Sequence, residues 1–261
     1  MDLGLRGRRA IVCGSSKGLG KACASALAAE GVHVVINARS SEQLTKAAEQ
    51  IEKDTGGQVV AVAADIVTET GRGAVLEVCP HPDILVNNAA GPPPGDFRGW
   101  TRDDWIKALD MSMLTSIAFI QAVLDGMVTR GFGRIVNITS SGVKSPGTYP
   151  SLGLSIAARS GLTGFVGTLA RQVASSNVTI NSLLPGRFDT DRLRSLVRDQ
   201  AEKERRADEQ ITAEQLRQIP ARRFGTPEEF GAVCAFLCSA HASYITGQNI
   251  VIDGGAFTGL L

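Results

Sequence analysis

Residues 13–20 read Cys-Gly-Ser-Ser-Lys-Gly-Leu-Gly, and this stretch decides the fold. It follows a short apolar run at residues 10–12 and opens an alanine-rich helical pattern over residues 18–30, which Gly31 ends. Glycines let a backbone turn sharply, and the free N–H groups at a helix start attract anions. The order strand, turn, helix therefore predicts a phosphate-binding βα unit rather than an ordinary turn. Its expected ligand residues are Gly14, Ser16, Lys17, Gly18, Leu19 and Gly20.

Short β-branched runs alternate with longer helical patterns along the rest of the chain. The strand candidates are residues 10–12, 32–37, 59–63, 84–86, 134–138, 178–184 and 249–252. The main helix candidates are residues 18–30, 42–54, 103–130, 154–175 and 227–239. Strands that are apolar on both sides suit a parallel sheet buried on both faces. The pattern predicts one domain over residues 1–261, a doubly wound Rossmann-type α/β fold with a seven-stranded parallel sheet and helices on both faces.

Two local signals refine the helix boundaries, and one charged segment stands apart from the alternation. Ser41 is a plausible N-cap for the second helix, and Thr226 with Pro227 predicts the start of the last one. Residues 189–223 are dense in charge and predicted to be helical. They form either a mobile lid over a substrate or a solvated helical excursion at the edge of the sheet.

Composition excludes several classes of function. The chain has 27 Lys and Arg against 26 Asp and Glu, so no basic surface supports nucleic-acid binding. No apolar run reaches the roughly 18 residues of a membrane span. Three scattered histidines and five cysteines without a CxxC motif give no metal site. An odd cysteine count without a secretory signal predicts reduced, buried thiols in a cytoplasmic protein.

The end of the second strand bears on the choice of cofactor. In dinucleotide-binding folds an acidic residue there binds the ribose 2′-hydroxyl of NAD. Here the residues are Asn37, Ala38, Arg39 and Ser40, with no acid. Arg39 and Lys17 are suited to a 2′-phosphate, because a guanidinium matches that anion. This favours NADP(H) over NAD(H), although each cation alone also fits a plain surface position.

Five further motifs occur in order along the chain. They are residues 83–90 (Asp-Ile-Leu-Val-Asn-Asn-Ala-Ala), 133–140 (Gly-Arg-Ile-Val-Asn-Ile-Thr-Ser), 185–190 (Pro-Gly-Arg-Phe-Asp-Thr), 223–229 (Arg-Phe-Gly-Thr-Pro-Glu-Glu) and 246–255, which begins Thr-Gly-Gln and ends Asp-Gly-Gly. With the glycine turn, they make the chain resemble the short-chain dehydrogenase/reductase family from about residue 5 to residue 255. It looks most like the 3-oxoacyl carrier-protein reductases and the sugar dehydrogenases.

The resemblance implies further cofactor contacts. In the family, a pair like Asp65 and Ile66 touches the adenine, and a threonine like Thr190 contacts the nicotinamide carboxamide. Arg39 and Ser40, at the end of the second strand, are also expected to bind the cofactor. The full set of expected cofactor contacts outside the glycine turn is Arg39, Ser40, Asp65, Ile66, Asn88, Arg159, Pro185, Gly186, Phe188 and Thr190.

The catalytic positions depart from the family pattern at three of four places. The family uses a serine, a tyrosine that protonates the substrate oxygen, a lysine that lowers the tyrosine pKa, and an asparagine. Ser140 fits the serine, but the other three positions hold Ser155, Arg159 and Ser112. A serine hydroxyl is a far weaker acid than a phenol, and an arginine stays charged. Together they suit the polarisation of a carbonyl, whereas Ser155 as a plain pocket-lining hydroxyl is the alternative.

Tyr149 is the candidate for a displaced acid. It lies in the loop between Ser140 and Ser155, close enough in sequence to fold into the same pocket, and Lys144 in that loop is a candidate to tune its pKa. The alternatives are a packing aromatic at the pocket rim and a solvated lysine.

Two functions remain open at this level. The first is an NADP(H)-dependent oxidoreductase that transfers a hydride between the nicotinamide and a carbonyl or alcohol substrate, such as a ketoacyl compound, a sugar or a small ketone. The second is an NADP(H)-binding protein without hydride transfer that acts as a sensor or binds a partner. The family resemblance also implies a homodimer or homotetramer formed through the two long helices, residues 103–130 and 154–175.

Overall fold

The computed structural model describes residues 1–259 and contains one seven-stranded sheet. All neighbouring strands are parallel, in the order β3-β2-β1-β4-β5-β6-β7, which confirms the predicted doubly wound architecture. The strands are β1 (Arg9–Val12), β2 (His33–Ala38), β3 (Val59–Ala63), β4 (Ile84–Asn87), β5 (Gly133–Ile138), β6 (Val178–Pro185) and β7 (Asn249–Ile252). The order reverses between β1 and β4, and ligands of such sheets bind at the carboxyl ends of the strands beside that point.

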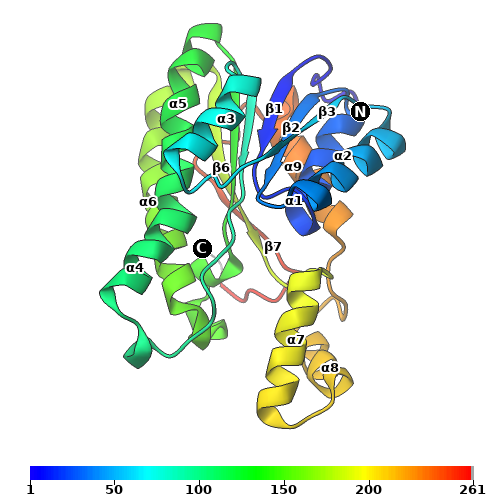
Figure 1. Cartoon of the computed structure of the whole chain (residues 1–261), viewed down its shortest axis with the longest axis vertical. Helices are drawn as coiled ribbons and strands as arrows, with labels where there is room; N and C mark the ends of the chain where they lie inside the picture. Colours follow the sequence, from blue (N-terminus) through cyan, green and yellow to red (C-terminus); the bar gives the residue numbers. More distant parts are fainter. Residues whose placement is uncertain (260–261) are drawn as a thin grey trace.

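Helices cover both faces of the sheet (Figure 1). One face carries α1 (Gly18–Ala29), α2 (Ser41–Thr55) and α9 (Pro227–Cys238); the other carries α3 (Glu69–Val78), α4 (Arg102–Leu109), α5 (Thr115–Arg130) and α6 (Gly153–Val173). Each face buries its own apolar cluster against the strands. All five cysteines are buried and unpaired, as predicted.

Two details differ from the sequence-based expectations. Helix α3 was not predicted, because its sequence is interrupted by two glycines and buries only Gly71 and Val75. The N-cap of α2 is Ser40, not Ser41: the Ser40 hydroxyl accepts a hydrogen bond from the Gln43 N–H. By contrast, Thr226 caps α9 in a capping box, as predicted.

The predicted helix over residues 103–130 is not uniform. A π-helical turn, Asp110–Leu114, separates α4 from α5 within one continuous run. Within residues 1–259 this run, Arg102–Arg130, is the one helix that is long and apolar enough to cross a membrane by length and composition alone, which the sequence reading did not expect. Its apolar side, including Phe119 and Ile120, is buried against the sheet.

The charged segment after β6 forms α7 (Asp191–Glu204) and α8 (Asp208–Arg217). These helices project from the rest of the molecule at the bottom of Figure 1. They share a small apolar cluster of Val197, Ala201 and Ile211 that is separate from the two main clusters. The segment is therefore helical, and its role as a lid remains a prediction.

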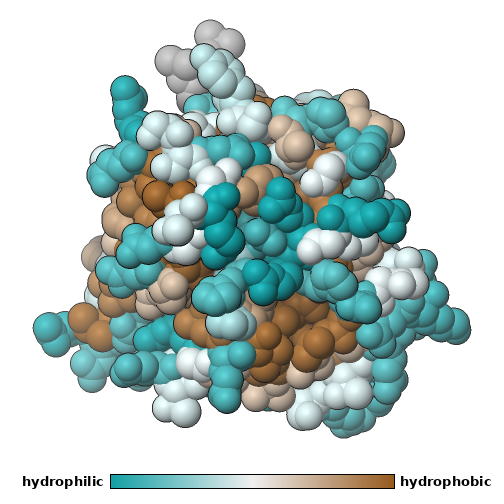
Figure 2. Space-filling view, turned by 90° about the horizontal axis from the view of Figure 1, so that it is seen from above, coloured by the Kyte–Doolittle hydropathy of each residue, from teal (hydrophilic) through white to brown (hydrophobic). Residues whose placement is uncertain are grey.

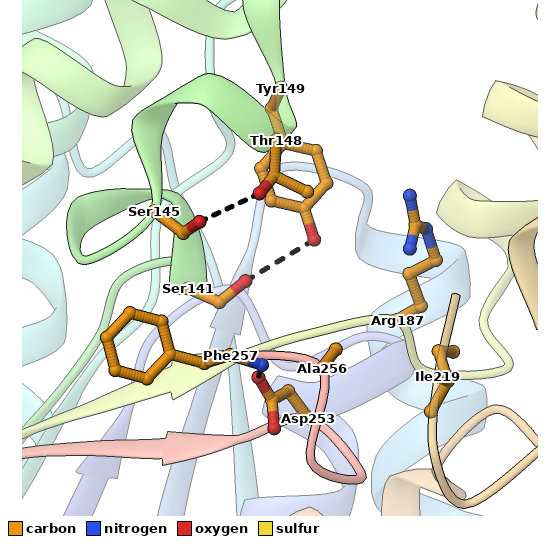
Figure 3. Close-up of a pocket in the computed structure, with 9 residues that line it drawn as sticks. All are labelled: Ser141, Ser145, Thr148, Tyr149, Arg187, Ile219, Asp253, Ala256 and Phe257. Carbon is orange, nitrogen blue, oxygen red and sulfur yellow. Dashed lines mark hydrogen bonds between the residues drawn. The ribbon is translucent and has the colours of Figure 1, made fainter. Parts of the chain in front are cut away.

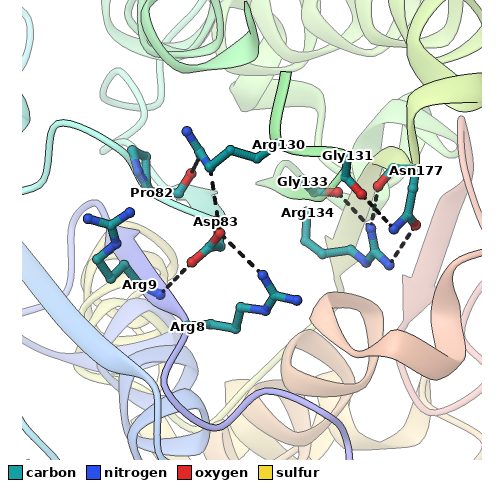
Figure 4. Close-up of polar contacts among 9 residues, drawn as sticks. All are labelled: Arg8, Arg9, Pro82, Asp83, Arg130, Gly131, Gly133, Arg134 and Asn177. Atoms are coloured by element: carbon teal, nitrogen blue, oxygen red, sulfur yellow. Dashed lines mark hydrogen bonds and ion pairs between the residues drawn. The ribbon is translucent and has the colours of Figure 1, made fainter. Parts of the chain in front are cut away.

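The amino ends of the central strands are held by a polar network (Figure 4). The Asp83 carboxylate, just before β4, accepts a hydrogen bond from the Arg9 N–H at 3.0 Å and pairs with Arg8 and Arg130. The fully buried Arg134 guanidinium donates to carbonyl oxygens of neighbouring segments, among them Asn177 at 2.8 Å. This network is at the sheet edge opposite the glycine turn, so we assign it a structural role. Seen from above in Figure 2, apolar side chains gather in patches bounded by polar ones.

Candidate active site

The turn between β1 and α1, which we call the glycine cradle, has two positions where only glycine fits. A Cβ atom on Gly14, which has a φ of 58°, would lie 2.6 Å from the Asn88 carbonyl oxygen. A Cβ atom on Gly20 would lie 2.3 Å from the Gly14 carbonyl oxygen. The Asn88 side chain donates a hydrogen bond to that same carbonyl at 2.9 Å. Helix α1 begins at Gly18 without a side-chain cap, so its first N–H groups are available to an anion.

A residue that the sequence reading missed anchors this cradle. The buried Ser15 hydroxyl donates to the Val12 carbonyl at 2.7 Å and accepts from the Asn37 N–H at 3.0 Å. It thereby ties the ends of β1 and β2 together beneath the turn. Its place in the middle of the glycine stretch was visible in the sequence, but its inward direction was not. Ser16 is half-buried and Leu19 packs at the edge of the core.

The residues expected near the adenosine lie at the ends of β2 and β3. Arg39 is exposed and forms no ion pair within the described part of the chain. Ser40 caps α2 through its hydroxyl. Asp65 is exposed, with its carboxylate accepting from the Val67 N–H at 3.1 Å, and Ile66 packs partly against the core. Among the residues expected near the adenosine, the Arg39 guanidinium is therefore the group that remains available to bind a ligand.

The loop after β6 borders the glycine turn from the other side. Thr190 caps α7, and its methyl carbon lies 3.6 Å from the Cβ position of Gly18. The Lys17 ammonium is 3.9 Å from the Asp191 carboxylate, an exposed pair that links the turn to α7. Pro185 ends β6, and the Gly186 N–H donates to the end of β7.

Phe188 in this loop, which is expected to contact the cofactor, has its side chain turned into the core. The ring is 5% exposed and packs edge-to-face on Phe230, with ring centres 5.3 Å apart. Its side chain therefore belongs to the core, and its backbone remains as the part that can face a ligand.

The three substituted catalytic positions meet at one guanidinium. Arg159 donates through Nη1 to the Ser155 hydroxyl at 2.5 Å and to the Ser112 hydroxyl at 3.3 Å, and through Nη2 to the Ala89 carbonyl at 3.2 Å. Ser155 and Arg159 are one turn apart on α6, while Ser112 lies in the π-helical turn and Ala89 follows β4. Gly91 covers this group so closely that a Cβ there would lie 3.1 Å from the Ser155 hydroxyl oxygen. We call Ser112, Ser155 and Arg159 the guanidinium cluster.

The electrostatics of the guanidinium cluster are unusual for a buried site. Arg159 is 9% exposed, and none of its partners is an anion. Burial lowers the pKa of the Arg159 guanidinium from its ordinary value to about 10, and the nearby charge of Arg192 on α7 acts in the same direction. At neutral pH the cluster therefore carries a full positive charge, and no carboxylate within residues 1–259 pairs with it.

Among residues 1–259, Ser140 and Tyr149 form no hydrogen bond with each other or with the guanidinium cluster. Ser140 is half-buried at the end of β5, and its hydroxyl accepts from the Gly142 N–H at 3.1 Å. The Tyr149 hydroxyl instead lies 3.3 Å from that of Ser141, in a separate pocket (Figure 3). The Arg187 guanidinium, not Lys144, is the cation near the Tyr149 ring, at 5.7 Å from its centre. Lys144 faces the Phe257 ring.

A wider opening lies between the loops that follow β4 and β5. Trp100 fits against glycines of both loops, since Cβ atoms on Gly95 and Gly153 would lie 2.6 and 2.9 Å from its indole. Phe97 and Pro150 line the same opening, and Lys203 of α7 borders it. The arrangement offers an apolar wall with a charged rim, where Arg98 pairs with Asp96 and Lys203 adds a further cation.

Comparisons with known proteins identify the class. A family model described as Enoyl-(Acyl carrier protein) reductase matches residues 14–257. The chain is 34% identical to the 3-oxoacyl-[acyl-carrier-protein] reductase FabG of Aquifex aeolicus, over 98% of this chain and 100% of that protein. It is also 34% identical to acetoacetyl-CoA reductase of Cupriavidus necator, over 97% of this chain and 99% of that protein. The chain therefore belongs to the short-chain dehydrogenase/reductase family.

A solved structure supports the same assignment. The crystal structure of L-sorbose reductase from Gluconobacter frateurii, complexed with NADPH and L-sorbose, is similar with a TM-score of 0.93 and 29% sequence identity. The match covers 100% of both chains. The chain is accordingly a member of this oxidoreductase family, and within the family it resembles the 3-oxoacyl carrier-protein reductases.

Proposed function

We propose that this protein binds NADP(H) and transfers a hydride between the nicotinamide and a substrate that bears a carbonyl group or the corresponding alcohol. The observation that carries the proposal is the glycine cradle, where α1 begins without a side-chain cap and the Cβ positions of Gly14 and Gly20 are closed by backbone atoms. The cofactor, when bound, supplies or accepts the hydride.

The residues present fit this cofactor on the structural evidence of the cradle and of Arg39. The uncapped N–H groups of α1 are suited to the pyrophosphate. Arg39, exposed and free of an ion pair among residues 1–259, is suited to the 2′-phosphate. Thr190, whose methyl carbon lies 3.6 Å from the Cβ position of Gly18, borders the cradle and would hold the nicotinamide end of the cofactor. The similarity to L-sorbose reductase, whose crystal structure contains NADPH, supports the same assignment.

The chain's own residues perform three tasks in this proposal. The guanidinium cluster fixes the orientation of the substrate oxygen and supplies positive charge. Ser140 offers a second hydroxyl to that oxygen. Helices α7 and α8 close over the opening and exclude water, with Arg192 of α7 brought towards Arg159.

The test is equilibrium binding followed by turnover. NADPH binding is measured by the fluorescence of the reduced nicotinamide, and NADPH oxidation is measured at saturating cofactor with a ketoacyl thioester, a ketose and a cyclic ketone. Tight binding with oxidation by a member of this panel supports hydride transfer. Tight binding without oxidation favours the sensor or partner-binding alternative, and no binding rejects the proposal.

Two further properties accompany the proposal. The buried, unpaired thiols support a cytoplasmic location. A homodimer or homotetramer is supported by exposed apolar side chains on the α4–α5 run, including Trp105 and Leu114, and by open space above Gly164 and Gly167 on α6. Light scattering at micromolar protein concentration checks the assembly, and a monomeric mass contradicts it.

A further inference from the structure

The starting point is a buried cation whose hydrogen-bond donors are only partly used. The Arg159 guanidinium donates through Nη1 to the hydroxyls of Ser112 and Ser155. Its Nη2 donates once, to the Ala89 carbonyl. A guanidinium has five N–H donors, so the Nε hydrogen and one Nη2 hydrogen have no partner among residues 1–259. Nε and Nη2 form one edge of the guanidinium, and such an edge binds a carboxylate through two parallel hydrogen bonds.

The charge of this group is also uncompensated. A buried charge is costly unless it is paired, and Arg159, at 9% exposure, pairs with no carboxylate of the described chain. The sugar hydroxyls of a bound cofactor are neutral, so a contact with them would satisfy a donor without compensating the charge. The guanidinium cluster therefore requires an anion from another ligand.

A second unpaired cation stands at the start of α7, which projects from the carboxyl ends of the strands (Figure 1). Arg192 is exposed and forms no ion pair among residues 1–259. Its neighbour Asp191 is already paired with Lys17 and Arg194. The charge of Arg192 acts on the Arg159 guanidinium, so the two cations are close enough to repel each other. An anion bound at the cluster would remove that repulsion and favour the approach of α7.

Apolar groups lie beside the guanidinium cluster, because the same two segments build both. The loop after β4 contributes Ala89 to the cluster and Phe97 and Trp100 to the wider opening. The start of α6 contributes Ser155 to the cluster and Gly153 to the opening. A ligand with an anionic head and a small apolar remainder matches this arrangement.

We propose that the substrates are 2-oxo acids or the corresponding 2-hydroxy acids, and that Arg159 binds their carboxylate while Arg192 of α7 closes over it. The inference rests on the proposed NADP(H) binding and hydride transfer. The cluster occupies the positions at which the family acts on a substrate carbonyl, so an anion held there is adjacent to the reacting carbon. In a 2-oxo acid the carboxylate is bonded directly to that carbon, which leaves the carbonyl oxygen for Ser140.

The reduction balances with water as the proton source. The carbonyl carbon accepts the hydride with its two electrons, the C=O π pair moves to the oxygen, and that oxygen takes a proton from water. The carboxylate and the guanidinium are unchanged, and the hydroxide left behind is neutralised by solvent. The net change is 2-oxo acid plus NADPH plus H⁺ to 2-hydroxy acid plus NADP⁺.

The decisive experiment compares acids with their own methyl esters. NADPH oxidation by the full-length protein is followed with two matched pairs, 4-methyl-2-oxopentanoate with its methyl ester and phenylglyoxylate with its methyl ester. Each ester keeps the reacting carbonyl and the apolar group but has no charge. We expect kcat/KM for each acid to exceed that for its ester at least about tenfold, because the ester cannot form the charge-assisted hydrogen bonds.

The other outcomes separate this inference from the proposed function. Oxidation of NADPH by the esters at least as fast as by the acids overturns the inference and leaves the proposed function intact. Oxidation only by the ketoacyl thioester, ketose or cyclic ketone of the first test has the same meaning. NADPH binding without oxidation by any of these compounds overturns both the inference and hydride transfer.

Binding of an analogue that does not react makes the test independent of turnover. Oxamate, which has the shape and charge of a small 2-oxo acid, is titrated by calorimetry into the protein saturated with NADPH. The uncharged ethyl oxamate is its matched control. We expect oxamate to bind at least about tenfold more tightly than ethyl oxamate. Equal affinities contradict the proposed carboxylate site.

Variants assign the bound carboxylate to its two cations. Arg159→Met should weaken oxamate binding by about 10²-fold or more, the usual cost of removing one partner of a buried charge pair. Arg159→Lys should weaken it less, because lysine keeps the charge but not the two-pronged geometry. Arg192→Ala should weaken it by about two- to fivefold, as expected for an exposed charge.

Arg198→Ala is the matched control for Arg192→Ala. Arg198 is exposed on the same helix and also forms no ion pair among the described residues, but it lies six positions further on and points in another direction. Its replacement should leave oxamate binding unchanged. Circular dichroism verifies that each variant is folded. Unchanged oxamate affinity in Arg159→Met, or equal effects of Arg192→Ala and Arg198→Ala, overturns the inference.

Discussion

Replacing Arg159 by methionine separates stability from function in one measurement. Methionine is flexible and of similar length, so it fills most of the space of the guanidinium side chain without its charge. The expected result is a protein that is nearly as stable as the original but that has lost the ability to stabilise a negative oxygen.

The magnitude follows from two opposing contributions. Burial lowers the pKa of Arg159 to about 10, and at about 1.4 kcal/mol per pH unit this fall corresponds to about 3.5 kcal/mol against the charged form in the folded protein. Three hydrogen bonds at about 1 kcal/mol each contribute about 3 kcal/mol in its favour. The two nearly cancel, so the free energy of unfolding should change by less than about 1.5 kcal/mol.

The assay is urea unfolding without cofactor, with thermal unfolding as a second measure. For a chain of this length the predicted change corresponds to a Tm shift within about 4 °C in either direction. A loss above about 3 kcal/mol would show that the hydrogen bonds of the guanidinium hold the site together. In that case the claim that the charge is retained for binding would fall.

Further predictions address the cofactor site, the fold and the tyrosine. Arg39→Ala should weaken NADPH binding at least about tenfold and leave NADH binding nearly unchanged; equal losses in titrations with both cofactors refute a 2′-phosphate contact. Gly20→Ala should abolish NADPH binding, because its Cβ would lie 2.3 Å from a carbonyl oxygen, whereas Gly73→Ala, with nothing within 4 Å, should leave binding unchanged and stabilise α3 by up to about 1 kcal/mol in thermal unfolding. Tyr149→Phe should change turnover less than about threefold, and a 100-fold loss would identify Tyr149 as the acid. Because the depressed pKa of Arg159 is still about 10, its cation is fully present below about pH 9 and is lost as pH rises through 10, so the rate profile should show no loss from this group between pH 7 and 9.

The fold was predictable because its signals are local. The turn at Gly14–Gly20 needs glycine for steric reasons within a few residues, and β-branched runs reveal buried parallel strands without knowledge of their partners. Helix α3 was missed for the same reason: it depends on burying Gly71 and Val75 against other segments and has little periodicity of its own. The error at the start of α2 concerned one residue, since Ser40 and Ser41 are both suitable caps and only the backbone angles decide.

The sequence named the members of the candidate site but not their arrangement. The sequence motifs pointed to Ser112, Ser155 and Arg159 one by one as departures from a family pattern. Their convergence requires the π-helical turn at Asp110–Leu114, which no periodicity indicates. Similarly, Tyr149 was close enough in sequence to reach the pocket, yet its loop carries the hydroxyl to Ser141.

The convergence changes how the three departures should be understood. Taken singly, a serine for tyrosine, an arginine for lysine and a serine for asparagine each remove a function. Taken together, one guanidinium bridges both hydroxyls and the Ala89 carbonyl, so each change supplies a partner for another. A tyrosine at position 155 would need space that the close approach of Gly91 restricts. A site that had only lost its acid would not need to keep a buried positive charge at its centre. The guanidinium cluster is therefore better explained as a binding site for an anion.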